Sequence, residues 1–173
     1  MFGIADLLKL LLSAFIILPV VSVIREGGYL IASHFLGAKS SKVTVGCGPR
    51  IFNLGVFEIR KYYFMYSWCS YEELKVDKNW AHLLVYSAPI LSNIIVALGV
   101  NGLLASESIG METFWQQFIF YAFYFVLFDI LPLYYPDGQP SNGRVIYDLI
   151  RHGRLTDYQK DDPQEELEHG TNY

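Results

Sequence analysis

Long apolar runs dominate this chain and limit what it can fold into. The first extends from about residue 7 to 36, the second from about 82 to 104, and the third from about 114 to 135. Each is long enough to cross the hydrocarbon core of a bilayer, which takes roughly 20 helical residues. Hydrophobic residues make up 53% of the chain and charged residues 17%, which is too apolar for an ordinary soluble domain. The sequence therefore predicts a membrane α-helical protein with three transmembrane helices.

The charged residues between these runs predict the orientation of the chain. Basic loops are retained in the cytoplasm. The turn between the second and third runs carries Glu107 and Glu112, whereas the segment between the first two runs is basic. We therefore expect an integral, multi-pass protein with its N-terminus outside and its C-terminus in the cytoplasm. The basic residues of the first loop are Lys39, Lys42, Arg50, Arg60, Lys61, Lys75 and Lys78.

The loop between the first two runs carries strand signals. Residues 42–45 alternate in polarity, residues 46–49 form a Gly-x-Gly-Pro turn signal, and residues 56–65 are rich in β-branched and aromatic side chains. These patterns predict a small cytoplasmic-side β-hairpin or sheet over about residues 41–66. Its free edge has two interpretations: it adds a strand from an extended peptide, or the hairpin is purely structural.

The C-terminal region divides into two parts. Val145, Ile146, Leu149 and Ile150 repeat at helical spacing, which indicates a short amphipathic helix at the membrane interface. Residues 156–173 are acidic and predict a disordered, solvated tail. We therefore expect a membrane domain over residues 1–155 followed by this tail. The net charge of −4 argues against a nucleic-acid partner.

Arg25, Glu26 and Asp129 are ionisable residues that lie within the apolar runs. Arg25 and Glu26 lie toward the inner end of the first run, and Asp129 lies within the third. Ionisable groups at such depth usually pair with one another or face a wet cavity. Arg25 has Glu26, Asp129 and Asp137 as candidate partners. The alternative is that Arg25 and Glu26 merely mark the end of the membrane span.

The stretch around Arg25 resembles the site-2 protease family of intramembrane zinc metalloproteases. The first core helix of that family carries a His-Glu-x-x-His motif, followed by Leu-Gly. The counterpart here is Arg25-Glu26-Gly27-Gly28-Tyr29, followed by Leu36-Gly37. The family often continues into a Gly-x-Gly-Pro-Arg-apolar-Phe sequence, which is matched by residues 46–52.

Two later segments extend this resemblance to about residues 5–150. Ala88-Pro89 with Asn93 is loosely similar to a second-helix element of the family. Asp129-Ile130-Leu131-Pro132 resembles the third-helix Asn-x-x-Pro pattern, which is followed by an Asp-Gly that supplies the last metal ligand. That Asp-Gly corresponds either to Asp137-Gly138 or to Asn142-Gly143. The resemblance implies a three-transmembrane-helix, site-2-protease-like core.

The zinc chemistry of the family does not transfer to this chain. Two histidines at i and i+4 bind the zinc ion, and the glutamate between them deprotonates the bound water. Arg25 and Tyr29 replace these histidines; arginine stays protonated, and a neutral phenol is a poor ligand. Glu26 keeps the general-base position. The third ligand is Asp137 in one alignment and is replaced by Asn142 in the other, so at most one zinc ligand remains.

The resemblance therefore implies a catalytically inactive pseudoprotease that binds or scaffolds another integral membrane protein or transmembrane peptide in the lipid bilayer. We expect no catalytic residue and no cofactor. Arg25 would replace the charge of the metal and hold Asp137 or Glu26, and Tyr29 would fill the second ligand position. Asp129 and Asn142 would line the same cavity, and Pro132 belongs to the same motif. The alternatives are an accessory subunit of a larger membrane complex, or an active zinc metalloendopeptidase with an atypical metal site.

Overall fold

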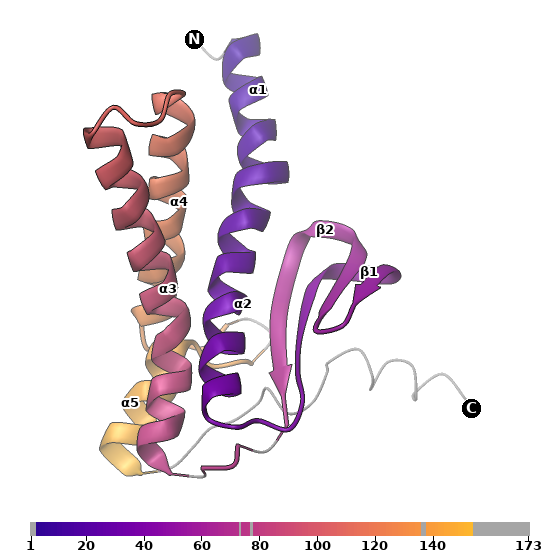
Figure 1. Cartoon of the computed structure of the whole chain (residues 1–173), viewed down its shortest axis with the longest axis vertical. Coiled ribbons are helices and arrows are strands. Elements are labelled where there is room, and N and C mark those ends of the chain that lie inside the picture. Colours follow the sequence, from indigo (N-terminus) through magenta and orange to yellow (C-terminus); the bar gives the residue numbers. More distant parts are fainter. Residues whose placement is uncertain (1–2, 73, 77, 136–137, 154–173) are drawn as a thin grey trace.

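The computed structural model describes residues 3–72, 74–76, 78–135 and 138–153. One long helix stands between a helical hairpin on one side and a β-hairpin on the other (Figure 1). In chain order the elements are α1 (Ile4–Leu12), the π-helical turn η1 (Ser13–Ile17), α2 (Leu18–Phe35), β1 (Ser41–Leu54), β2 (Phe57–Tyr71), α3 (Asn79–Ala105), α4 (Glu112–Ile130) and α5 (Asn142–His152).

The long helix consists of α1, η1 and α2 without a break. Pro19 follows the π-helical turn and occupies the first turn of α2. Proline has no backbone N–H and cannot donate to the carbonyl four residues earlier. A π-helical turn inserts an extra residue into the helical repeat, so the change in hydrogen bonding occurs where proline interrupts the ladder. The chain therefore continues as a helix through Pro19.

Helices α2 and α3 approach each other closely at Gly28. A Cβ atom at this position would lie 2.7 Å from the carbonyl oxygen of Ala88 and 2.8 Å from the Cα of Pro89. Nearby, the Ser92 hydroxyl lies 3.1 Å from the carbonyl oxygen of Ile24 and donates to it. Small residues permit such contacts between membrane helices. The missing side chain of Gly28 therefore determines how near α3 lies to the charged turn of α2.

Strands β1 and β2 form a two-stranded antiparallel sheet whose register shifts several times. Because of these shifts, Val43 pairs with both Cys69 and Phe57. Gly46 has a φ of +83°, and a Cβ there would lie 2.5 Å from the Cα of Tyr63, so glycine is required at this bend. The hairpin predicted over residues 41–66 is present, and its second strand continues to Tyr71.

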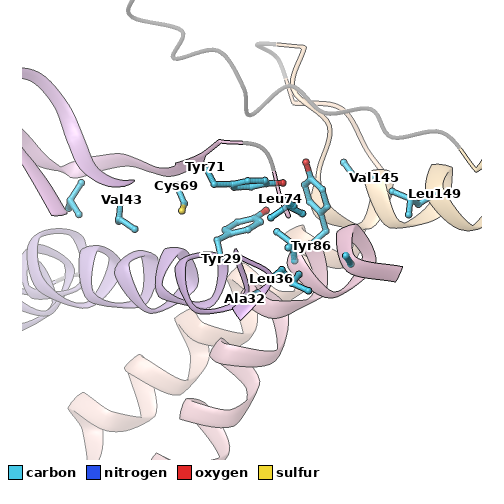
Figure 2. Close-up of a cluster of buried hydrophobic side chains, with 13 residues drawn as sticks. Tyr29, Ala32, Leu36, Val43, Cys69, Tyr71, Leu74, Tyr86, Val145 and Leu149 are labelled. Atoms are coloured by element: carbon cyan, nitrogen blue, oxygen red, sulfur yellow. The ribbon is translucent and has the colours of Figure 1, made fainter. Parts of the chain in front are cut away.

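Two apolar clusters hold these elements together. The larger one joins α2, the hairpin, the start of α3 and α5, and its centre includes Tyr29, Cys69, Tyr71 and Tyr86 (Figure 2). The predicted amphipathic helix is α5, which adds Val145 and Leu149 to that cluster. The smaller cluster joins the long helix to α3 and α4 through Ile17, Val21, Ala97, Phe118 and Ala122.

The prediction of a three-transmembrane-helix core is wrong. Among the described helices, two are long and apolar enough to cross a membrane: Asp6–Phe35, with 30 residues, and Asn79–Ala105, with 27. The third apolar run forms α4, which has 19 residues. Gln116, Gln117 and Asp129 lower the mean hydropathy of this helix. The prediction relied on its many aromatic residues, which have a lower hydropathy than aliphatic ones. The predicted tail, residues 156–173, lies outside the described residues.

Candidate functional site

A buried ion pair joins α2 to the end of α4. Arg25 donates through Nε to Oδ2 of Asp129 at 2.7 Å and through its second terminal nitrogen to Oδ1 at 2.8 Å. This is the two-pronged geometry in which a guanidinium binds a carboxylate most strongly. The Asp129 side chain is 2% exposed and that of Arg25 16%. The pair is therefore largely removed from solvent, and it connects residues 104 positions apart.

Glu26 adds a second carboxylate to the same guanidinium. Nη1 of Arg25 lies 2.5 Å from Oε1 of Glu26, whose side chain is 1% exposed. The other oxygen, Oε2, has no hydrogen-bond partner among the described residues. Arg25 therefore contacts two of its three predicted carboxylate partners, Glu26 and Asp129. The third, Asp137, lies outside the described residues. One guanidinium faces two acids, so its removal would leave both without a cation.

The hairpin closes the site from the other side of α2. Burial, and to a smaller extent the charge of Glu26, raises the pKa of the Cys69 thiol and keeps it protonated at neutral pH. Cys69 is 1% exposed and lies near Tyr29 and Tyr71 (Figure 2). Sequence reasoning did not assign Cys69 to the site, because a single cysteine in a strand carries no signal of what lies opposite.

One turn further along α2, Tyr29 reaches the first residue of α5. Its hydroxyl donates to Oδ1 of Asn142, and its ring packs edge-on against Tyr86 with 6.1 Å between the ring centroids. Tyr29 and Asn142 are 1% and 3% exposed. The amide nitrogen of Asn142 has no partner among the described residues. The structure thus joins the two degenerate motif positions in a neutral hydrogen bond, and the guanidinium carbon of Arg25 lies 5.8 Å from the centre of the Tyr29 ring.

The link between α4 and α5 is held by a network at Ser141. Its hydroxyl accepts from the backbone N–H groups of Leu133, at 3.2 Å, and Arg144, at 3.1 Å. The second of these bonds caps the N-terminus of α5. The same hydroxyl donates to the Leu131 carbonyl. Pro132 is exposed within this link. Ser141 thus connects the segment around Pro132 to the start of α5.

The arrangement does not fit the zinc ion of the site-2 proteases. The guanidinium of Arg25 occupies the space between Glu26 and Asp129, and it cannot donate an electron pair to a metal. The Tyr29 hydroxyl donates a hydrogen bond to Asn142, and the raised pKa of the Cys69 thiol keeps it protonated at neutral pH. Among the described residues, no three His, Cys, Asp or Glu side chains lie close enough together to hold a metal ion. Arg25, Glu26 and Asp129 instead form ion pairs, and Tyr29 and Asn142 form a hydrogen bond.

A second buried carboxylate lies in the hairpin, at a position that sequence reasoning missed. Glu58 is fully buried, and it pairs with Lys42 and Arg50 through Oε2 and with Arg60 through Oε1. Burial alone would raise the pKa of Glu58, but the hydrogen bonds from these three cations outweigh it and lower the pKa to about 2. The basic residues were visible in the sequence, whereas the register that gathers them was not.

Comparison with known proteins gives one informative similarity. No family model matches the chain. A curated protein of Bacillus subtilis (strain 168), the uncharacterized membrane protein YwmF, is 33% identical over 160 residues, which cover 92% of this chain and all of that protein. The similarity extends far beyond the two long apolar helices, so it cannot arise from the composition of membrane helices alone.

Proposed function

Because the chain belongs to the same family as the membrane protein YwmF, we propose that it is a multi-pass membrane protein that binds another membrane protein or a transmembrane peptide without cutting it. Its place in the membrane rests on that relationship and on the two long apolar helices. The finer proposal is that it is a catalytically inactive relative of the site-2 proteases. That proposal rests on the motifs around Arg25 and on the geometry of the residues that replace the histidines.

The single observation that carries the proposal is the position of Arg25. In the resemblance it replaces the first histidine of the zinc motif. Its guanidinium lies between two buried carboxylates, Glu26 and Asp129. A permanent positive charge at this point supplies the attraction that a metal ion would supply, but it cannot activate water. The bundle is thereby stabilised, and Glu26 is engaged in an ion pair instead of acting as a base.

A groove between the long helix and the hairpin is the proposed binding surface. It has a volume of about 410 Å³, and apolar side chains line both of its walls. Phe15, Val20 and Ile24 come from the helix, whereas Val45 and Ile59 come from the hairpin. A groove with apolar walls beside a membrane span suits the apolar side chains of another transmembrane segment.

We propose that the N-terminus lies outside and that the segment joining the two long apolar helices lies in the cytoplasm. That segment carries Lys39, Lys42, Lys75 and Lys78. Positive charge on such a segment favours its retention in the cytoplasm.

Purification of the tagged protein in mild detergent tests the proposal. The sample is assayed for bound membrane proteins by mass spectrometry and for metal in parallel. The Val20→Trp variant fills the groove with a bulky apolar side chain. Leu98→Trp is the matched control, because Leu98 is 57% exposed on α3 and does not line the groove. We expect a stoichiometric membrane partner that is lost in Val20→Trp and retained in Leu98→Trp, without bound zinc.

Two outcomes would contradict the proposal. Stoichiometric zinc, together with cleavage that is lost in Glu26→Gln, would identify an active metalloprotease with an atypical site. A partner retained equally by both tryptophan variants would exclude the groove as its binding surface. If the partner can be removed only by denaturation, the protein is a permanent subunit of a larger membrane complex, with the groove as a fixed interface.

A further inference from the structure

A second pocket lies further along the long helix than the groove, between the C-terminal end of α2 and the hairpin. We propose that this pocket binds an anionic phospholipid, with the phosphate beside Lys42 and the upper acyl chains against the apolar wall. The inference goes beyond the proposed function and does not depend on it. It rests on the shape and chemistry of the pocket, the charge of the adjoining cluster and the position of both along the membrane-spanning helix.

The pocket combines an apolar wall with a polar rim. Its volume is about 640 Å³, within the range of sites that hold drug-sized ligands. Leu30, Ile31 and Phe35 of α2 and Val56 of the hairpin supply the apolar wall. The polar rim consists of His34, Lys39, Ser40, Ser41 and Lys42. A ligand that fits both parts has one anionic end and one hydrocarbon end.

The cluster around Glu58, next to the pocket, is rich in positive charge. Glu58 is one carboxylate with three cationic partners, Lys42, Arg50 and Arg60. Lys42 and Arg50 alone are two cations that share this one carboxylate. Lys42 and Arg50 meet the same oxygen of Glu58, and their side chains are 37% and 56% exposed. A phosphodiester carries one negative charge and accepts hydrogen bonds from both cations, as phosphate groups do.

The position of the pocket suits the headgroup region of a membrane. It lies at the end of the first membrane-spanning helix, where Phe35 and Ile31 are 83% and 59% exposed. The hairpin runs back along that helix, since Phe64 packs against Phe15 with 4.8 Å between the ring centroids. The aromatic part of the hairpin therefore lies beside the middle of the long apolar helix, whereas Lys42 lines the pocket at the end of that helix. Basic groups at this level attract anionic lipids by about 1 kcal/mol each.

Lipid titration of the purified, delipidated full-length protein tests the inference. Native mass spectrometry measures the binding of phosphatidylglycerol and of phosphatidylcholine with the same acyl chains. We expect one tightly bound phosphatidylglycerol and much weaker binding of phosphatidylcholine. Lys42→Gln should weaken phosphatidylglycerol binding about fivefold, the equivalent of one such cation. Lys61→Gln removes the same charge from the same hairpin outside the pocket, and should change binding by less than about twofold.

A second pair of measurements separates the lipid from other ligands. Val56→Trp fills the pocket without altering charge, and it should reduce phosphatidylglycerol binding as well. Glycerol phosphate, which has the anionic end alone, should not displace the lipid at equal concentration. Equal binding of the two lipids, equal loss in Lys42→Gln and Lys61→Gln, or displacement by glycerol phosphate would each overturn the inference. Thermal midpoints of all variants verify that the hairpin remains folded.

Discussion

At the scale of single residues, Arg25 has the largest electrostatic role in the bundle. It contacts Asp129 with two nitrogens and Glu26 with a third. A buried ion pair adds little net stability compared with an apolar pair of the same shape, but loss of one partner strands the other charge. Here that loss would strand two carboxylates in a membrane-spanning bundle. Residue 25 therefore determines whether α2 and α4 can pack together.

We expect Arg25→Ala to reduce the free energy of unfolding by about 3–5 kcal/mol, the usual effect of uncovering a buried charge. The measurement is the thermal midpoint in detergent. A variant that also carries Glu26→Gln and Asp129→Asn removes the stranded charges and should recover much of the loss. An unchanged midpoint in Arg25→Ala would refute the view that the ion pair takes the structural place of a metal.

At the scale of elements, packing between α2 and α3 depends on one of two adjacent glycines. A Cβ at Gly28 would meet the Ala88 carbonyl and the Cα of Pro89, both of which are backbone atoms of α3 that cannot rotate away. A Cβ at Gly27 would meet nothing within 4 Å. The two positions have the same backbone chemistry, and they differ in what faces them.

Gly28→Ala should therefore destabilise the protein by about 1–3 kcal/mol, as overpacking does. Gly27→Ala should be neutral or stabilise it by up to about 1 kcal/mol, because alanine has fewer backbone conformations than glycine in the unfolded chain and a higher helix propensity. Urea or thermal unfolding of the two variants measures this difference. Equal effects at both positions would mean that α3 does not approach α2 at Gly28.

The hairpin provides a prediction of pH dependence. The folded pKa of Glu58, about 2, lies below the ordinary value for glutamate, about 4.3. A lowered pKa means that the folded state binds the proton less tightly than the unfolded state. The stabilisation is therefore complete above about pH 5 and is lost as the pH falls from there toward 2.

Hydrogen exchange of the hairpin amides at several pH values between 6 and about 2.5 measures that loss, with the intrinsic pH dependence of exchange subtracted. Glu58→Gln should flatten the profile over this range and should also lower protection near neutral pH, because three cations then lack their carboxylate. Glu72→Gln is the control, since Glu72 is exposed just after β2. If protection in Glu58→Gln still falls at low pH as in the original protein, groups other than Glu58 cause the pH dependence.

At the scale of the whole molecule, the proposed topology places the two ends of α3 on opposite sides of the membrane. Single cysteines introduced at Gly110 and Lys78 into a chain without Cys47 and Cys69 report this with a membrane-impermeant thiol reagent. Gly110 tolerates a side chain, since a Cβ there meets nothing within 4 Å. We expect labelling of Gly110→Cys from outside. Lys78→Cys should be labelled after the membrane is opened. Labelling of Lys78→Cys from outside would reverse the proposed orientation of α3.

Much of the local structure could be predicted from the sequence, because it depends on neighbouring residues. The length of the apolar runs predicted the helices, and their composition predicted a membrane protein. Alternation and β-branched residues predicted the hairpin. Its turn was predicted at residues 46–49 but lies at residues 55–56, and residues 46–49 form a bend within β1, where Gly46 adopts a positive φ. Helical spacing predicted α5. The same reasoning failed for α4, because length and aromatic content overestimated the hydropathy of a segment that also contains Gln116, Gln117 and Asp129.

The tertiary structure alone decided which groups meet. The sequence offered Arg25 three carboxylates, and the crossing of α2 with α4 brings in Asp129 from 104 positions away. The contact between Tyr29 and Asn142 depends on the link through Ser141, and the cluster around Glu58 depends on register shifts in the hairpin. Periodicity and composition are local properties, whereas contacts between distant residues depend on helix crossings and strand register. The sequence therefore determined which chemical groups are present, and the fold determined which of them are paired.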